Sequence, residues 1–451
     1  MNAYLASVLE SVKTKHGNEP EFVQTVEEVL SSLEPVIEKH PEYEKVDLLG
    51  RMVEPERMFT FRVVWCDDNG QWHTNRGWRC QFNGAIGPYK GGLRFQKNVY
   101  EGIIKFLGFE QTFKNSLTGL PIGGAKGGSD FDPAGKSDAE VMRFCQSFMT
   151  ALYRYIGPDI DVPAGDMGVG GREIGYLYGQ YRRLKGVWEN GVLTGKGLSY
   201  GGSLIRPEAT GYGAMYYLQE VLKHENDTIE GKRIAISGYG NVGWGIMKKA
   251  SQLGAKVTYF AGPDGYVHDP DGVITDEKLN FILEMRAKDP MHCKPYADKF
   301  GCEFVAGEKC WGVKDVDVYM PAAMQNDVKM ESAEKIAASG VKYYIEVANM
   351  PTTNDALEFL KEQKHMVVAP SKAVNAGGVG VSALEMAQNS ERLVWTAEEV
   401  DHQLHKMMEN IHKVSAEAAA EYGLGYDLVA GANIVGFQKV ADAMMAQGIT
   451  Y

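Results

Sequence analysis

The chain has 451 residues, about three times the size of the commonest domain, and this length predicts two compact domains. Its 44% hydrophobic and 24% charged residues are ordinary for a globular protein, and no run approaches the ~18 consecutive apolar residues of a membrane-spanning helix. The formal net charge of −12 argues against the dense basic face that nucleic acids and anionic membranes require. We therefore expect no nucleic-acid partner and no membrane partner.

The first residues and the cysteines indicate a cytoplasmic location. The N-terminal segment mixes charges into an amphipathic pattern and lacks the basic, apolar and small-residue regions of an export signal. The six cysteines are scattered and form no C-x-x-C pair, which is typical of reduced thiols in a reducing compartment.

The first part of the chain predicts helices followed by a sheet. Apolar residues recur at helical spacing from Val23 to about Arg57, and the segment from Met58 to Phe82 then alternates as strands do. Within that segment, the run 68–70 reads Asp-Asn-Gly, and Asn and Gly tolerate the positive φ angles of a hairpin turn. The sequence therefore predicts a mixed α/β domain.

Helices and a long loop come next. Residues 101–117 predict a helix, and Ser137 can cap another because Glu140 follows three positions later. The segment from Asp159 to Gly171 is rich in Gly, Pro and Asp, which predicts a loop, and ordered loops often carry functional residues.

From Gly231 onward the pattern becomes strand, glycine turn, helix and strand, and further strands are expected at residues 316–320, 343–347 and 366–369. This alternation predicts a Rossmann-type, doubly wound parallel sheet. The overall fold class is thus α/β with two domains: a mixed-sheet domain over residues 1–202, joined by a C-terminal helix over 428–451, and a dinucleotide-binding domain over 203–427.

The glycines of the second domain predict a nucleotide site. Gly238, Gly240 and Gly243 match G-x-G-x-x-G directly between an expected strand and an expected helix, where the glycines allow a sharp turn, close approach of a pyrophosphate and tight packing. Asp264 follows the next strand, near the usual position of the acid that binds the adenosine ribose. Because no Lys or Arg lies between Val257 and Gly272, the sequence favours NAD, with NADP as the alternative.

Three lysines stand near glycine-rich segments of the first domain. Lys90 and Lys126 are each flanked by glycines, and Lys114 lies on the expected helix between them. A lysine in a closed, partly dry cleft has a lowered pKa and can exchange protons near neutral pH. The alternative is that all three are ordinary surface cations.

A metal site is not expected. His402 and His405 could share one helical face, but the surrounding sequence is typical of a solvated amphipathic helix with no third ligand nearby.

Several long stretches carry a resemblance to a known family. FNGAIGPYKGGLRF, KFLGFEQTFKNSLTGLPIGGAKGGSDFDP, DVPAGDMGVGGREIGYLYGQYR, SGYGNVGWG and PSKAVNAGGVGVSALEMAQNS together resemble the hexameric glutamate dehydrogenases, particularly the bacterial, NAD-linked clostridial type. The resemblance runs nearly end to end. It implies reversible oxidation of L-glutamate to 2-oxoglutarate and ammonium in a homohexamer whose first domain binds substrate and mediates oligomerisation.

The resemblance also implies roles for individual residues. Lys126 matches the lysine that activates water, and Asp166 matches the aspartate that moves protons to and from the amino group. Lys114 matches the binder of the α-carboxylate. The remaining implied substrate residues are Lys90 and Ser382 for the side-chain carboxylate, with Gly91, Gln111, Ala164, Arg206 and Val379 shaping the pocket. The implied cofactor contacts, beyond the glycine turn, are Thr210, Asn241, Val242, Asn349 and Asn375.

Two alternatives remain. A leucine, valine or phenylalanine dehydrogenase would need an apolar wall where Lys90 stands, and a non-catalytic nucleotide-binding scaffold would not need both Lys126 and Asp166. The chain departs from many relatives at residues 322–326, which read Ala-Ala-Met-Gln-Asn where a Thr is common. We expect this change to affect cofactor affinity. Hydride transfer also implies closure of two domains, with a hinge expected near residues 201–207 and near the C-terminal helix.

Overall fold

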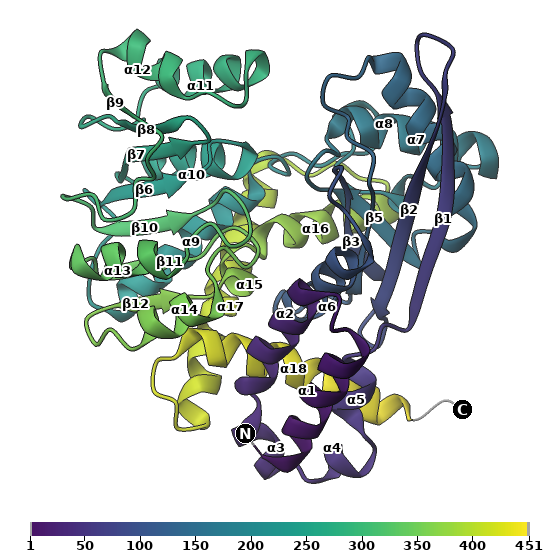
Figure 1. Ribbon diagram of the computed structural model, residues 1–451, viewed down its shortest axis with the longest axis horizontal. Helices are drawn as coiled ribbons and strands as arrows, with labels where there is room; N and C mark the ends of the chain where they lie inside the picture. The colour runs from purple at the N-terminus through teal and green to yellow at the C-terminus, as the bar shows by residue number, and fades with distance from the viewer. Residues whose placement is uncertain (1, 449–451) are drawn as a thin grey trace. The chain divides into compact units, whose positions relative to one another are not determined.

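The computed structural model describes residues 2–448 and divides them into two compact units (Figure 1). Unit 1 contains residues 2–206, 379–400 and 433–448, and unit 2 contains residues 207–378 and 401–432. These bounds differ from the sequence-based boundaries chiefly at 379–400, which the sequence assigned to the nucleotide domain. Nothing in the local pattern of that helical segment indicates which unit it packs in.

Unit 1 is built on a five-stranded mixed sheet in the order β1-β2-β4-β3-β5. Its strands are β1 (Arg57–Cys66), β2 (Trp72–Asn83), β3 (Tyr89–Phe95), β4 (Gly123–Ser129) and β5 (Asp161–Gly165). The expected hairpin is confirmed: β1 and β2 pair in antiparallel register, and Gly70 in the turn between them has a φ of 80°. β3 pairs in parallel with both β4 and β5. The expected loop at 159–171 therefore contains a strand.

The helices of unit 1 include the two that the sequence predicted most specifically. The helix at Glu101–Leu117 has the expected bounds, and Ser137 and Glu140 form a complete capping box. The helices lying wholly in this unit are α1 (Ala3–Lys15), α2 (Pro20–Ser31), α3 (Glu34–Lys39), α4 (Glu42–Lys45), α5 (Leu48–Met52), α6 (Glu101–Leu117), α7 (Asp138–Leu152) and α8 (Gly171–Lys185). Most of α16 (Gly377–Glu391) and of α18 (Leu428–Gln447) also belongs to it.

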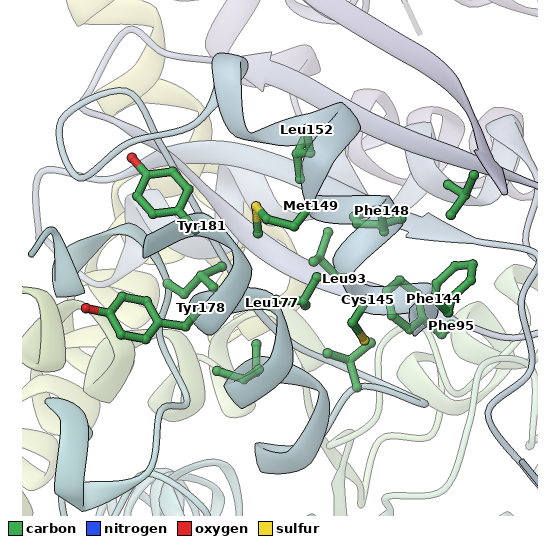
Figure 2. Packing of buried hydrophobic residues seen from close by; sticks show 14 of the residues in the cluster. Leu93, Phe95, Phe144, Cys145, Phe148, Met149, Leu152, Leu177, Tyr178 and Tyr181 are labelled. Carbon is green, nitrogen blue, oxygen red and sulfur yellow. The ribbon is translucent and has the colours of Figure 1, made fainter. Parts of the chain in front are cut away.

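Strand pairing determines which residues share a face of this sheet. Val63 of β1 is paired with Asn75 of β2, so odd-numbered residues of both strands point to one side, and the registers extend this side to the odd residues of β3 and β4. That face forms an apolar core with α7 and α8. Figure 2 shows Leu93 and Phe95 packed among Phe144, Phe148 and Leu177, and all five side chains are buried.

The even-numbered residues form the opposite face, which α6 covers. Gly108 of α6 lies against Cys80 and Phe82. The backbone itself is packed closely there, since a Cβ at Gly91 would come within 1.6 Å of the Ala125 carbonyl oxygen. Close packing between the strands thus requires a glycine at position 91, beside Lys90.

A buried ion pair joins three strands of the sheet. The Arg79 guanidinium on β2 donates to both carboxylate oxygens of Asp161 on β5 and, at 2.9 Å, to the Gly91 carbonyl on β3. Both charged side chains are fully buried. Removing one partner of such a pair leaves an uncompensated buried charge, which costs about 3–5 kcal/mol.

We predict that Arg79→Met destabilises unit 1 by about 3–5 kcal/mol because Asp161 then lies buried without its cation. The measurement is urea unfolding followed by tryptophan fluorescence. Arg62→Met, at an exposed position on β1, is the matched control and should change stability by less than about 0.5 kcal/mol. Equal stability of the two variants would contradict the prediction.

Unit 2 contains a seven-stranded sheet in the order β12-β11-β10-β6-β7-β8-β9. Its strands are β6 (Arg233–Ser237), β7 (Lys256–Gly262), β8 (Gly265–His268), β9 (Glu303–Ala306), β10 (Val318–Pro321), β11 (Tyr343–Ile345) and β12 (Val367–Ala369). The expected parallel strands are confirmed, because β12, β11, β10, β6 and β7 pair in parallel. β8 and β9 add an antiparallel edge that the sequence did not predict.

Helices connect these strands (Figure 1). They are α9 (Ala209–His224), α10 (Asn241–Gln252), α11 (Asp276–Lys288), α12 (Lys294–Phe300), α13 (Met330–Ala338), α14 (Asn354–Lys361), α15 (Ser371–Val374) and α17 (Ala397–Glu421). One apolar core of this unit includes Tyr319, Tyr344 and Ile336, all fully buried. Across residues 2–448, the helices are too short or too polar to span a membrane.

Candidate functional site

The sheet of unit 1 brings the three candidate lysines to one side. Lys126 is paired with Cys80, and Lys90 with Gly124, so both lysines point from the even-numbered face toward the side covered by α6. Lys114 comes from α6 itself. Strand register and one covering helix thus bring together lysines that are distant in the chain. Lys90 and Lys126 are both buried, so the alternative that they are surface cations is wrong.

Lys90 is a buried cation bonded to a neutral group. Its side chain is part of a residue that is only 1% exposed, and its Nζ donates to the Thr194 hydroxyl at 2.9 Å. In the described part of the chain no carboxylate forms an ion pair with it. Burial, reinforced by the nearby cation Arg206, lowers the pKa of Lys90 well below its ordinary value. The sequence did not indicate a role for Thr194, because this residue stands in no recognisable motif.

Lys126 is paired with Asp166. Its Nζ lies 3.1 Å from the Asp166 Oδ2, and the same oxygen accepts a 2.8 Å hydrogen bond from the Arg94 Nε. Burial lowers the pKa of Lys126, although the Asp166 charge opposes this change. Burial alone would raise the pKa of Asp166, but the Arg94 and Lys126 cations outweigh it and hold that pKa well below its usual range. The structure therefore brings the two expected proton-transfer groups together and adds Arg94 to them.

Lys114 lies near the end of α6. Burial is the main reason that its pKa falls to about 8, and the Lys126 ammonium lowers it further. A group with such a pKa changes charge under mildly alkaline conditions, so the electrostatic attraction of this site for anions depends on pH.

The other candidate substrate residues also belong to unit 1. Ser382, on α16, accepts a 2.7 Å hydrogen bond from the Arg206 Nε. Gln111 donates to Asn115, which in turn donates to the Lys90 carbonyl at 3.0 Å. Ala164 lies on β5 opposite Gly92, and Val379 is buried near the start of α16.

A buried ion pair fixes α16 in unit 1. The Lys196 Nζ lies 2.7 Å from Glu385 Oε1, and the Gly195 amide donates to the other oxygen of that carboxylate at 2.9 Å. This pair joins the helix that carries Ser382 to the segment that carries Thr194. Neither charged residue was selected from the sequence, since a lone lysine and a helical glutamate give no signal of pairing.

The glycine turn of unit 2 has the geometry that a pyrophosphate requires. Gly238 has a φ of 80°, and a Cβ at Gly243 would come within 2.1 Å of the Gly238 carbonyl oxygen. At Gly240 an added Cβ would meet nothing within 4 Å. The first and third glycines are thus needed for turn and packing, and the second leaves open space at the start of α10, where backbone N–H groups favour an anion.

Two side chains, Asp264 and Arg286, differ from the sequence-based expectation for the part of the site that would bind adenosine. Both oxygens of Asp264 accept from the Cys293 amide at 3.0 Å, so this carboxylate is bonded at the start of α12 and is only in part available to a ribose. Arg286 donates to the Asn241 side chain at 2.6 Å, while its Nη1 is buried without a partner among the described residues. The cation near the turn therefore comes from α11 and lies outside residues 257–272.

The remaining candidate cofactor residues lie in the same unit. Asn375 donates to Asn349 Oδ1 at 3.0 Å and to the Val347 carbonyl at 2.8 Å, and its own Oδ1 is buried without a partner in the range 2–448. An orphaned amide oxygen fits a ligand with an amide N–H, such as a nicotinamide. Thr210 lies in the first turn of α9, and Val242 follows Asn241 in α10.

One group of potential metal ligands occurs elsewhere in unit 2. Ligand atoms of Glu220, His405 and Glu409 lie within 4.8 Å of one another. The Lys223 ammonium lies 2.5 Å from Glu220 and 4.0 Å from Glu409, so it already balances these carboxylates. We assign no metal to this group.

This chain combines a doubly wound unit with a site suited to proton transfer. The same combination is found in enzymes that move hydride to or from a dinucleotide, and it places the chain in that class. A family model described as Glu/Leu/Phe/Val dehydrogenase, dimerisation domain, matches residues 55–183, and one described as Glutamate/Leucine/Phenylalanine/Valine dehydrogenase matches residues 201–448. The chain therefore belongs to the Glu/Leu/Phe/Val dehydrogenase family.

Individual relatives are similar to this chain over nearly their whole length. The chain is 68% identical to an NAD-specific glutamate dehydrogenase of Clostridium symbiosum, with 100% of both chains covered. It is 52% identical to an NADP-specific glutamate dehydrogenase of Haemophilus influenzae, with 99% of both chains covered. A solved glutamate dehydrogenase structure matches with a TM-score of 0.98 at 67% identity over 100% of both chains.

We predict that binding of a dicarboxylate weakens as pH rises through about 8, because Lys114 is cationic below a pKa of about 8 and neutral above it. Titration calorimetry with glutarate between about pH 6.5 and 9.5 should show a loss of affinity of roughly tenfold, the effect of ~1.4 kcal/mol. Lys114→Met should bind more weakly and flatten the pH dependence, whereas the exposed Lys97→Met should leave it unchanged. Constant affinity of the unaltered protein across this range would contradict the prediction.

Proposed function

We propose that the protein is a glutamate dehydrogenase that converts L-glutamate to 2-oxoglutarate and ammonium, reversibly, with NAD as hydride acceptor. Unit 1 is the substrate-binding and oligomerisation domain, and unit 2 is the dinucleotide-binding domain. The resemblance of the chain to glutamate dehydrogenases at 52–68% identity supports this assignment.

The observation that supports glutamate most directly is the state of Lys90. A buried ammonium without an ionic partner is unfavourable, and a carboxylate placed beside it would supply the missing counter-charge. A glutamate side chain brings that carboxylate into the site, whereas leucine, valine and phenylalanine would leave the cation against an apolar group. Lys90 therefore favours glutamate over the other substrates of the family.

The remaining lysines separate the tasks that the reaction requires. Lys114 binds the α-carboxylate, which holds the α-carbon in one orientation. Asp166 accepts protons from the substrate amino group and returns them. Lys126 removes a proton from the water that attacks the α-carbon once the carbon–nitrogen double bond has formed, and the lowered pKa of Lys126 assists this step. Bound NAD supplies the chemistry of hydride acceptance.

The residues of unit 2 fit this cofactor. The open space at Gly240 and the start of α10 suit a pyrophosphate, and the unpaired Asn375 oxygen suits the carboxamide. Thr210, Asn241, Val242 and Asn349 complete the proposed contacts. The absence of cations from 257–272 favours NAD, and NADP remains the alternative, with Arg286 as the available cation.

We further propose a homohexamer in the cytoplasm. The family description of residues 55–183 as a dimerisation domain supports self-association, and the reduced state expected of the scattered cysteines supports a reducing compartment. L-glutamate, 2-oxoglutarate and ammonium are the proposed small-molecule partners.

The function is tested by a steady-state assay of glutamate and leucine, each with NAD and with NADP. We expect kcat/KM for glutamate to exceed that for leucine by at least about 10³-fold, since an unpaired buried polar group discriminates strongly between substrates. We also expect NAD to be preferred to NADP. A preference for leucine would refute the substrate assignment.

We predict that Lys90→Met lowers kcat/KM for glutamate by about 10²–10³-fold, because truncating one member of a buried charge pair costs about 2–5 kcal/mol. The loss for leucine should be much smaller, and kinetics with both substrates give the measurement. Lys97→Met is the control, since Lys97 is an exposed lysine of the same unit. Equal losses for glutamate and leucine would argue that Lys90 acts only in folding.

A further inference from the structure

One carboxylate oxygen in unit 1 serves two cations. Asp166 Oδ2 lies 2.8 Å from the Arg94 Nε and 3.1 Å from the Lys126 Nζ. The Arg94 bond is the shorter of the two, and Arg94 is itself only 3% exposed. Lys126 thus shares its counter-ion with a group that never loses its charge.

The backbone around Arg94 makes this arrangement possible. β3 and β5 pair in parallel, with Gly92 opposite Ala164, so the continuation of β5 carries Asp166 toward Arg94. Gly92 leaves the room that is needed, because a Cβ there would come within 2.9 Å of the Asp166 Cβ. Arg94 and Asp166 are therefore held together by strand register as well as by charge.

We propose that Arg94 is a positioning residue for Lys126 and Asp166: it holds the carboxylate at the end of β5 and withdraws from Lys126 part of the negative charge that would otherwise stabilise its ammonium form. This inference rests on the proposed function, because it assigns Lys126 the role of a base. A base must first release its own proton, and a shared counter-ion makes that release easier.

The charges that face Lys126 agree with this role. Asp166 raises the pKa of Lys126, whereas Arg94 on β3 and Arg79 on β2 lower it, after burial as the largest cause. Lys114 on α6 is a further cation, and the Lys126 charge, after burial as the largest cause, lowers the pKa of Lys114. Removing the Arg94 charge takes away one repulsion and leaves Asp166 wholly to Lys126. Both effects raise the pKa of Lys126.

The test compares Arg94→Gln with the unaltered full chain. Competitive labelling with acetic anhydride, read by mass spectrometry on the peptide that contains Lys126, follows the neutral amine as a function of pH and needs no turnover. We expect the labelling midpoint of Arg94→Gln to lie about one pH unit or more above that of the unaltered protein. The rising limb of kcat at saturating glutamate should move in the same direction. Arg62→Gln, at an exposed position on the same sheet, should change neither.

Arg94→Lys retains the charge without the planar guanidinium, so its labelling midpoint should stay near that of the unaltered protein while kcat falls. An unchanged midpoint in folded Arg94→Gln would overturn the inference even if the protein oxidises glutamate. Conversely, a shifted midpoint in a protein that does not oxidise glutamate would refute the proposed function and leave the role of Arg94 toward Lys126 in place.

Arg94→Met fills the buried volume without an unpaired polar group and replaces Arg94→Gln if that variant does not fold. If neither folds, Arg94→Lys decides: a folded protein with reduced kcat supports the positioning role, and an unaltered kcat overturns it.

Discussion

Unit 1 holds the ammonium groups of several lysines on one buried face of its sheet, and the rest of the unit depends on this constraint. Like charges in a poorly hydrated site repel one another and lose solvation, so each needs a partner or a lowered pKa. Lys126 has Asp166, whereas Lys90 has only a hydroxyl, and the pKa of both is lowered. Helix α6 covers this face, and the buried Arg79 and Asp161 charges of the same sheet neutralise each other. An anionic substrate relieves the imbalance.

Much of the architecture could be predicted from sequence because it depends on local signals. The α6 helix, the Ser137 capping box and the strand–turn–helix at Gly238 are short-range patterns, and the structure has each of them. The expected Asp159–Gly171 loop is wrong in part, since Asp161–Gly165 is a five-residue strand whose composition is that of a turn. The antiparallel β8–β9 edge was missed because both strands are four residues long.

The residues of the candidate site likewise fall into those that the sequence identifies and those that only the structure identifies. Lys90, Lys114, Lys126 and Asp166 could be selected because they stand within long motifs of a known family. Thr194, Glu385 and Arg286 could not, because their importance comes from contacts between residues 45–190 positions apart. Arg94 lies within the stretch GPYKGGLRF, but its bond to Asp166 depends on the register of two strands. Tertiary pairing is the information that a single sequence lacks.

The chain passes between the two units at residues 206/207, 378/379, 400/401 and 432/433. Unit 1 therefore combines segments that lie far apart in the sequence: Gly436 of α18 packs against Phe113 of α6, and Asn433 donates a hydrogen bond to Glu28 of α2. Because each unit is assembled from separate segments of the chain, cutting the chain at any one point leaves neither unit whole and separate from the other.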